Sequence, residues 1–284
     1  MTLLVTGASG HLGRLAVLAL LDRGVEPGSI VATARQLTAI KDLADLGVET
    51  RRADYDDPDS LDAAFAGVDR VLLVSSSAVG QRFDQHRNVV DAADRQGVSL
   101  LAYTSVLRAD ASTLSLAEDH LATERYLAET GVPHLLLRNG WYLENYTENV
   151  APALQSRAVY GAARDGRVSA AARADYAEAG AVALVEGTPG QVHELGGDAA
   201  FTMAEYAAAV TAASGTEVGY TDLPADEYAA VLESAGLPTG YAQLLADSDR
   251  GLADGDLLET SGTLSRLIGR PTTALSDALR AAVA

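Results

Sequence analysis

The feature that most constrains this chain is a glycine-rich turn near its N-terminal end, between an apolar strand and an apolar helix. The turn has the spacing G-x-x-G-x-x-G and comprises Gly7, Ala8, Ser9, Gly10, His11, Leu12 and Gly13. A strand that turns so sharply, and a helix that then packs closely on it, need glycine where a side chain would collide. The helix N-terminus also presents free N–H groups and the positive end of its dipole. The motif in this context predicts a site for the pyrophosphate of a dinucleotide rather than a plain turn.

The first 140 residues alternate between short apolar strands and helices, which is typical of a parallel, doubly wound sheet. We expect strands at residues 3–6, 30–34, 48–53, 71–75, 100–105 and 134–137. We expect helices at residues 12–23, 38–46, 60–66, 85–96 and 117–130. Right-handed crossovers place the carboxyl ends of such strands on one edge, where ligands bind. The predicted fold is a Rossmann-like α/β fold.

The pattern loosens after Arg138 and indicates a second, smaller unit. Helices at residues 175–186 and 202–214 flank a strand at residues 192–195, and the tail from Tyr220 reads as largely helical. We therefore expect a dinucleotide-binding Rossmann domain over residues 1–150. A C-terminal α/β substrate lobe, partly interleaved with the first domain, is expected over residues 151–284.

The residue after the second strand bears on the choice of dinucleotide. NAD sites place an acid there to hold the ribose 2′-hydroxyl, whereas this chain reads Ala34-Arg35 and has no acid until Asp42. A guanidinium can bind a 2′-phosphate through two hydrogen bonds. Arg35 therefore favours NADP, with NADPH preferred over NADH, although an arginine here could also be a solvated helix cap.

Two further strand ends carry candidate cofactor residues. Asp54 follows the third strand and is placed to meet the adenine, or else it is an ordinary turn residue. Ser75, Ser76 and Ser77 follow the fourth strand, where they offer small hydroxyls beneath the cofactor or form a plain turn.

Charge and composition exclude several classes of partner and chemistry. Acidic residues outnumber basic ones by 39 to 21, for a formal charge of −18; this field repels phosphate backbones and anionic lipid, so we expect neither nucleic acid nor a membrane as partner. The chain has no cysteine and its 5 histidines show no metal-ligand spacing, so we expect no thiol chemistry and no metal. Nothing in the sequence requires a flavin. The first residues lack the pattern of a signal peptide, and we expect a cytoplasmic protein.

The catalytic pair that short-chain dehydrogenases usually carry after the fifth strand is missing. None of the 11 tyrosines has a lysine four residues on, because Lys41 is the only lysine. In that region His120 and Glu124 lie on one helix face. A carboxylate beside the imidazole would raise its pKa and favour proton donation near neutrality, or the pair is an exposed helix salt bridge.

Several segments resemble the NmrA-like atypical short-chain dehydrogenases, and within them the bacterial NAD(P)H:quinone oxidoreductases of type 2. The resemblance runs nearly end to end. The resembling segments include Val79-Gly80-Gln81-Arg82, Ala102-Tyr103-Thr104-Ser105 and Arg173-Ala174-Asp175-Tyr176. The distinctive ones are Gln85-His86-Arg87-Asn88 and Arg138-Asn139-Gly140-Trp141-Tyr142.

The resemblance implies a two-domain enzyme that passes reducing equivalents from NADPH to a quinone without flavin. It implies cofactor contacts from residues 7–12, Arg35 and residues 75–77, together with Asn139, Gly140, Trp141, Tyr142, Leu143, Glu144 and Arg173. His120, His86, Tyr142 or Asn139 could donate a hydrogen bond to the quinone oxygen. In ether-reductase relatives a catalytic lysine occupies the position of His120, so a lysine-based mechanism does not carry over.

Two other functions stay open on the sequence. The chain could be a non-catalytic NADP(H) sensor of the NmrA type, with its acid-rich segment 222–259 as a protein contact. It could also reduce another small conjugated carbonyl or ether. A homo-oligomer is compatible with either reading.

Overall fold

A computed structural model describes residues 1–78 and 80–283 of the chain. Val79, which belongs to one of the resembling segments, and Ala284 lie outside the described residues. The chain forms two compact units. The first, here called the Rossmann unit, comprises Met1–Ala109, Glu118–Asn139 and Arg173–His193. The second, the C-terminal unit, comprises Asp110–Ala117, Gly140–Ala172 and the described residues from Glu194 onward. The expected domain division at residue 150 stays a prediction.

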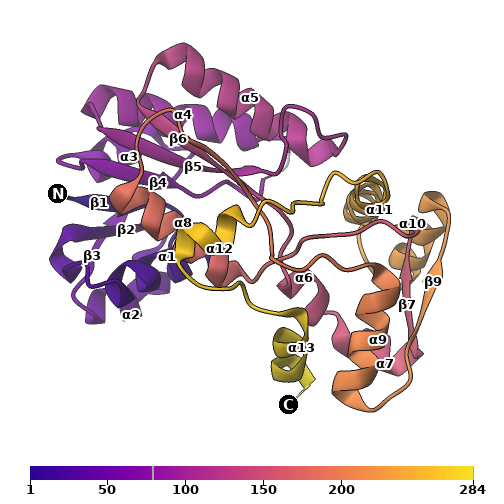
Figure 1. The fold of residues 1–284 in the computed structure, drawn as a ribbon. Coiled ribbons are helices and arrows are strands. Elements are labelled where there is room, and N and C mark those ends of the chain that lie inside the picture. Colours follow the sequence, from indigo (N-terminus) through magenta and orange to yellow (C-terminus); the bar gives the residue numbers. More distant parts are fainter. Residues whose placement is uncertain (79, 284) are drawn as a thin grey trace. The chain divides into compact units, whose positions relative to one another are not determined.

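A seven-stranded sheet organises the Rossmann unit, in the order β3-β2-β1-β4-β5-β6-β8 (Figure 1). Its strands are β1 (Leu3–Val5), β2 (Ile30–Ala34), β3 (Glu49–Arg52), β4 (Arg70–Leu73), β5 (Leu100–Val106), β6 (His134–Asn139) and β8 (Val192–Leu195), of which Glu194 and Leu195 are counted with the C-terminal unit. The strands from β3 to β6 pair in parallel. The order reverses between β1 and β4, so the carboxyl ends of these two strands lie at the switch point where doubly wound folds bind ligands. The predicted fold class is confirmed.

Helices cover the sheet because each buries an apolar stripe on it. They are α1 (His11–Asp22), α2 (Lys41–Asp45), α3 (Pro58–Phe65), α4 (Arg82–Gln96), α5 (Ser115–Thr130) and α8 (Arg173–Glu186). The expected helix at residues 38–46 is a 3-10 turn, Leu37–Ile40, followed by the short α2. On one face of the sheet α8 packs against α1. Arg70 from β4 donates to the last carbonyls of α8, at 3.1 Å to Val185 O, and so closes the end of that helix.

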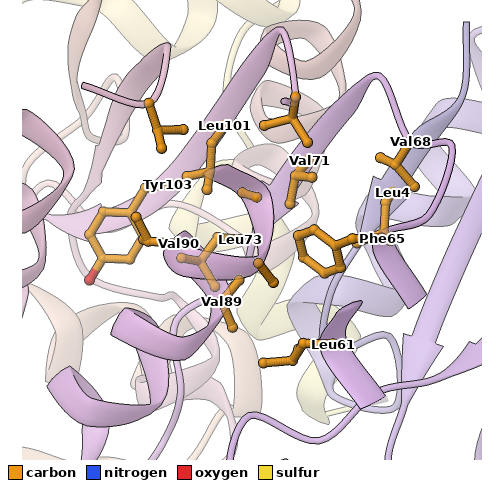
Figure 2. Close-up of a cluster of buried hydrophobic side chains, with 14 of the residues drawn as sticks. Leu4, Leu61, Phe65, Val68, Val71, Leu73, Val89, Val90, Leu101 and Tyr103 are labelled. Atoms are coloured by element: carbon orange, nitrogen blue, oxygen red, sulfur yellow. The ribbon is translucent and has the colours of Figure 1, made fainter. Parts of the chain in front are cut away.

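The core under α3 and α4 is a cluster of aliphatic side chains with Phe65 and Tyr103 (Figure 2). Leu61 and Phe65 of α3 and Val89 and Val90 of α4 are fully buried against the strands. Each such side chain contributes about 1.5–3 kcal/mol of transfer free energy. Figure 2 shows that the hydroxyl of Tyr103 points away from the cluster, and the site described below begins at that oxygen.

The C-terminal unit contains a small sheet and seven helices among its described residues. Strands β7 (Ala158–Gly161) and β9 (Gly219–Asp222) pair in parallel. The helices are α6 (Glu144–Thr147), α7 (Val150–Ser156), α9 (Met203–Ser214), α10 (Ala225–Ser234), α11 (Thr239–Ala253), α12 (Thr263–Ile268) and α13 (Leu275–Val283). Helix α9 begins with a capping box between Thr202 and Glu205. The tail from Tyr220 is largely helical, as expected, with α10 to α13 after residue 224. The sequence analysis did not predict β9, because this four-residue strand has no apolar alternation to mark it.

No helix among residues 1–78 and 80–283 combines the length and the apolar character needed to span a lipid bilayer.

Candidate functional site

The glycine turn has the geometry that the sequence predicts. Gly7 adopts a positive φ of 61°, and the N–H of Gly10 donates to Gly7 O at 2.9 Å. A Cβ on Gly13 would lie 2.5 Å from Gly7 O and 2.9 Å from Thr6 O, so only glycine lets α1 approach the end of β1 this closely. The N-cap of α1, Gly10, supplies no side-chain hydrogen bond. The turn and the helix N-terminus therefore fit the pyrophosphate of a dinucleotide.

The turn is supported from below by Tyr55, a residue that the sequence analysis did not select. Its hydroxyl lies 2.5 Å from Thr6 Oγ1 and 2.8 Å from Val74 O, and so ties β1 to the end of β4. Burial raises the pKa of Tyr55, so this hydroxyl keeps its proton. A single aromatic residue in the turn after a strand is a weak sequence signal, and only the fold shows its partners.

Arg35 follows β2 and is exposed. Its guanidinium has no ion-pair or hydrogen-bond partner in the part of the chain that the structure describes. The next acid along the chain, Asp42, pairs with Arg14, which also donates to Ala39 O at 2.7 Å. The end of β2 thus offers a free cation and no free carboxylate, which suits a 2′-phosphate better than a 2′-hydroxyl.

Asp54 and the three serines are held differently. Asp54 Oδ1 accepts from the N–H of Asp56 at 3.2 Å, as a turn residue does, and a contact with adenine stays a prediction. Ser75 N–H donates to Thr104 Oγ1 at 2.9 Å. Ser76 N–H donates to His86 Nε2 at 2.9 Å. The serine segment is therefore fixed by buried side chains of β5 and α4.

A buried polar cluster lies beside this segment, formed by α4, β5 and α5. The Tyr103 hydroxyl lies 2.7 Å from His120 Nδ1 and 3.3 Å from His86 Nδ1. Thr123 Oγ1 lies 3.0 Å from His86 Nδ1. Arg82, which is only 5% exposed, donates from Nε to Ser76 O at 2.6 Å. The structure thus brings together two predicted residues, His86 and His120, with three that the sequence analysis did not select.

The expected pairing of His120 with Glu124 is wrong. Glu124 instead accepts from Arg138 at 2.7 Å and from Ser105 Oγ at 2.5 Å, because β5 and β6 present these groups to its side of α5. Burial, the charge of Arg82 and His86 together lower the pKa of His120 well below its ordinary value. Burial and the charge of Arg82 lower the pKa of His86 to about 3. Both imidazoles are therefore neutral near pH 7 and are not proton donors of the imidazolium kind.

The remaining predicted residues are divided between the units. Asn139 ends β6 in the Rossmann unit and is 5% exposed. Its Oδ1 has no hydrogen-bond partner among the described residues, so a bound group with an N–H would satisfy a buried acceptor there. Arg173 begins α8 in the same unit.

In the C-terminal unit, Gly140 donates to Leu195 O at 2.8 Å and Leu143 donates to Ala171 O at 2.9 Å. Trp141 and Tyr142 are half-buried, and Glu144 begins α6. The backbone of residues 140–143 is thus fixed on both sides. Contacts of Trp141, Tyr142 and Glu144 with a cofactor or substrate stay predictions.

No group of three or more His, Asp or Glu side chains among the described residues is arranged to hold a metal ion.

Known proteins resemble this chain over almost its full length. A family model described as NAD(P)H-binding matches residues 7–186. Quinone oxidoreductase 2 of Escherichia coli is 47% identical over 276 residues, which cover 97% of this chain and 96% of that protein. The crystal structure of the NADPH-dependent quinone oxidoreductase from Escherichia coli, complexed with NADPH, is 46% identical and covers 98% of both chains with a TM-score of 0.96.

The triphenylmethane reductase of Citrobacter sp., complexed with NADP(H), is 34% identical with a TM-score of 0.94 and covers 99% of this chain and all of that one. The names of the two enzymes state different substrates, but both structures are complexes with NADPH or NADP(H). The similarity therefore includes reductases that share a cofactor and differ in substrate. The chain belongs to the NAD(P)H-binding, NmrA-like family of quinone oxidoreductase 2.

Proposed function

We infer that this chain is an NADPH-dependent quinone oxidoreductase that works without flavin. The near full-length identity to an enzyme of that activity carries the inference. The closed glycine turn and the unpaired Arg35 agree with it, because both are shaped for a phosphorylated dinucleotide.

We propose that the cofactor is bound by the residues that the sequence analysis selected. The turn and the N-terminus of α1 bind the pyrophosphate, and Arg35 binds the 2′-phosphate. Residues 75–77, 139–144 and 173, with Asp54, complete the proposed set. When bound, NADPH supplies the hydride that the quinone accepts. The protein needs only to orient the two rings and to stabilise charge on the quinone oxygen.

Steady-state oxidation of NADPH, followed with a panel of benzoquinones and naphthoquinones and repeated with NADH, tests the function. We expect turnover with several quinones and a lower kcat/KM with NADH. Tight and selective NADPH binding with no turnover for any acceptor would instead identify a sensor.

We also propose a cytoplasmic location and no nucleic-acid partner. The excess of acidic residues supports the second point, since a chain with a formal charge of −18 is repelled by phosphate backbones. If the electrophoretic mobility of duplex DNA is unchanged by the protein at any salt concentration, the result agrees with the absence of a nucleic-acid partner.

A further inference from the structure

A chain of hydrogen bonds in the Rossmann unit leads from the backbone after β4 to the ring of His120. It passes from Ser76 through His86 and Tyr103, and we call it the histidine–tyrosine chain. The two imidazoles and the phenol come from α4, β5 and α5, and their rings stack edge to face or tilted, with centroids 5.3 and 5.9 Å apart. The hydrogen-bonding capacity of each group fixes where its protons reside.

His86 determines which group donates and which accepts at each hydrogen bond of the histidine–tyrosine chain. Its Nε2 accepts from the N–H of Ser76, a group that can only donate, so this nitrogen carries no proton. A neutral His86 then carries its proton on Nδ1, which lies 3.0 Å from Thr123 Oγ1 and 3.3 Å from the Tyr103 hydroxyl. The Thr123 hydroxyl donates to Asp119 O at 2.9 Å and therefore accepts from His86.

The Tyr103 hydroxyl is the next donor, and its acceptor is His120. Its hydroxyl is buried and must donate, but His86 Nδ1 already holds a proton. The nearest acceptor is His120 Nδ1 at 2.7 Å. Burial raises the pKa of Tyr103, so the phenol keeps the proton that it donates. His120 Nδ1 is thereby an acceptor, and the proton of this ring is on Nε2.

His120 Nε2 has no hydrogen-bond partner among the described residues. The residue as a whole is 4% exposed, so its ring is held in place, and a bound group with an acceptor oxygen would satisfy a buried N–H there.

Burial is the main reason that the pKa of His120 is low and the ring neutral, and the charges around the ring act in the same direction. Arg82 on α4 faces both imidazoles, and its Nη1 lies 3.8 Å from Asp119 Oδ2 without a hydrogen bond in the described part of the chain. Glu124, on the same helix as His120, is bound by Arg138 of β6 and Ser105 of β5. The charge of Arg82 therefore adds to the effect of burial in lowering the pKa of His120.

We propose that Tyr103 is a positioning residue that fixes His120 as a neutral imidazole with its proton on Nε2, and that this N–H donates to the carbonyl oxygen of the quinone during reduction. The proposal rests on the proposed function above. Hydride adds to the quinone, its electron pair reduces the ring, and the oxygen that becomes negative is stabilised by the Nε2–H. His120 does not lose its proton, so the proton that completes the hydroquinone comes from water. His86 is excluded as a donor to substrate because both its nitrogens are engaged within the chain.

Kinetics and ¹⁵N NMR of the histidine rings test the proposal together. His120→Ala should lower kcat with a quinone by about 100-fold, as for loss of one oxyanion donor, with unchanged NADPH affinity. Tyr103→Phe should lower kcat by about tenfold, which corresponds to one lost hydrogen bond. Tyr126→Phe is the matched control. Tyr126 lies on α5, as His120 does, and its hydroxyl donates to Asp91 at 2.6 Å, so it takes no part in the histidine–tyrosine chain.

The NMR readout separates positioning from folding. In the unaltered protein we expect one protonated and one bare nitrogen in His120, with the proton on Nε2. We expect no titration of this ring between about pH 5.5 and 8, the interval in which an ordinary imidazole, with a pKa of about 6.5, would titrate. In Tyr103→Phe the two nitrogen signals should move towards averaged values. A proton on Nδ1 in the unaltered protein, or undiminished kcat in His120→Ala, would overturn the proposal. Unaltered protein inactive with every quinone would overturn the proposed function, while the tautomer of His120 would still be read directly.

Discussion

Single residues determine whether the cofactor site can form. At Gly13 the constraint on the side chain is steric, because the backbone of Thr6 and Gly7, just after β1, lies where a Cβ would be. At Arg35 it is electrostatic, because a free guanidinium stands where other dinucleotide sites have a carboxylate. The first residue governs binding of any dinucleotide and the second governs the choice between two of them.

Gly13→Ala should weaken NADPH binding by more than about tenfold, or about 1.4 kcal/mol. The added Cβ would come within 2.5 Å of Gly7 O, so the turn must open and its N–H groups lose their alignment. Isothermal titration calorimetry measures the effect. Gly28→Ala is the control, since nothing lies within 4 Å of a Cβ there. Equal affinities in both variants would show that the turn does not bind the pyrophosphate.

Arg35→Ser should lower NADPH affinity by about 10- to 100-fold, the range for a lost hydrogen bond to a charged group, and leave NADH affinity unchanged. Titration with both cofactors checks this. Arg95→Ser makes the same change in charge at the end of α4, where Arg95 pairs with Asp62, and should alter neither affinity. A parallel loss of NADH affinity would contradict the role assigned to Arg35.

At the scale of elements, one buried ion pair joins α5 to the sheet. Arg138 of β6 donates to Glu124 of α5 at 2.7 and 3.0 Å, and both side chains are at most 10% exposed. The pair ties the helix that carries His120 to β6. Removing one partner leaves a charge that the interior cannot solvate.

Glu124→Gln should lower the free energy of unfolding by about 3–5 kcal/mol. Replacing both partners, with Glu124→Leu and Arg138→Met, should restore part of this loss, although the Ser105 hydroxyl then lacks its acceptor. Urea unfolding gives the values. Asp45→Asn, which breaks the exposed pair with Lys41, should cost less than about 0.5 kcal/mol. Similar costs at the two sites would mean that the buried pair is not an anchor.

The regular elements of the Rossmann unit could be predicted from sequence because apolar strands and amphipathic helices carry local signals. Strand β2 is found at the expected residues, and α4 extends three residues before its expected start. The pair β7 and β9 could not be predicted, since each strand has only four residues and pairs with a strand far along the chain. The same reason explains the wrong partner for His120. Spacing on one helix suggested Glu124, whereas the actual neighbour, Tyr103, is on a strand 17 residues away.

Across the whole molecule the acidic residues do not act alike. The pKa values of Asp57, Asp198 and Glu205 lie below their ordinary range, since hydrogen bonds or an arginine favour the charged form. These groups stabilise the fold above their unfolded pKa and lose that contribution as the pH falls. Asp249 in α11 behaves in the opposite way. Burial, aided by Asp222, raises its pKa to about 6, while the N–H of Ala162 at 2.8 Å favours its charged form.

Asp249 should therefore reduce stability as the pH rises. The folded chain holds this proton more tightly than the unfolded chain, whose pKa is about 3.9. The free energy of unfolding should decrease by about 2 kcal/mol from this group between about pH 4 and pH 6 and then stay constant. Asp249→Asn keeps an acceptor for Ala162 and should abolish that decrease, which leaves the variant more stable than the unaltered protein at pH 7.

Chemical denaturation at closely spaced pH values measures the difference between the two curves. Asp254→Asn makes the same change in net charge at the exposed C-cap of α11 and separates a local effect from relief of the overall charge of −18. If both variants shift the whole curve by the same amount, the effect is one of net charge. A difference confined to the interval between about pH 4 and pH 6 assigns it to the buried carboxyl of Asp249, because linkage confines the effect of one group to the interval between its two pKa values.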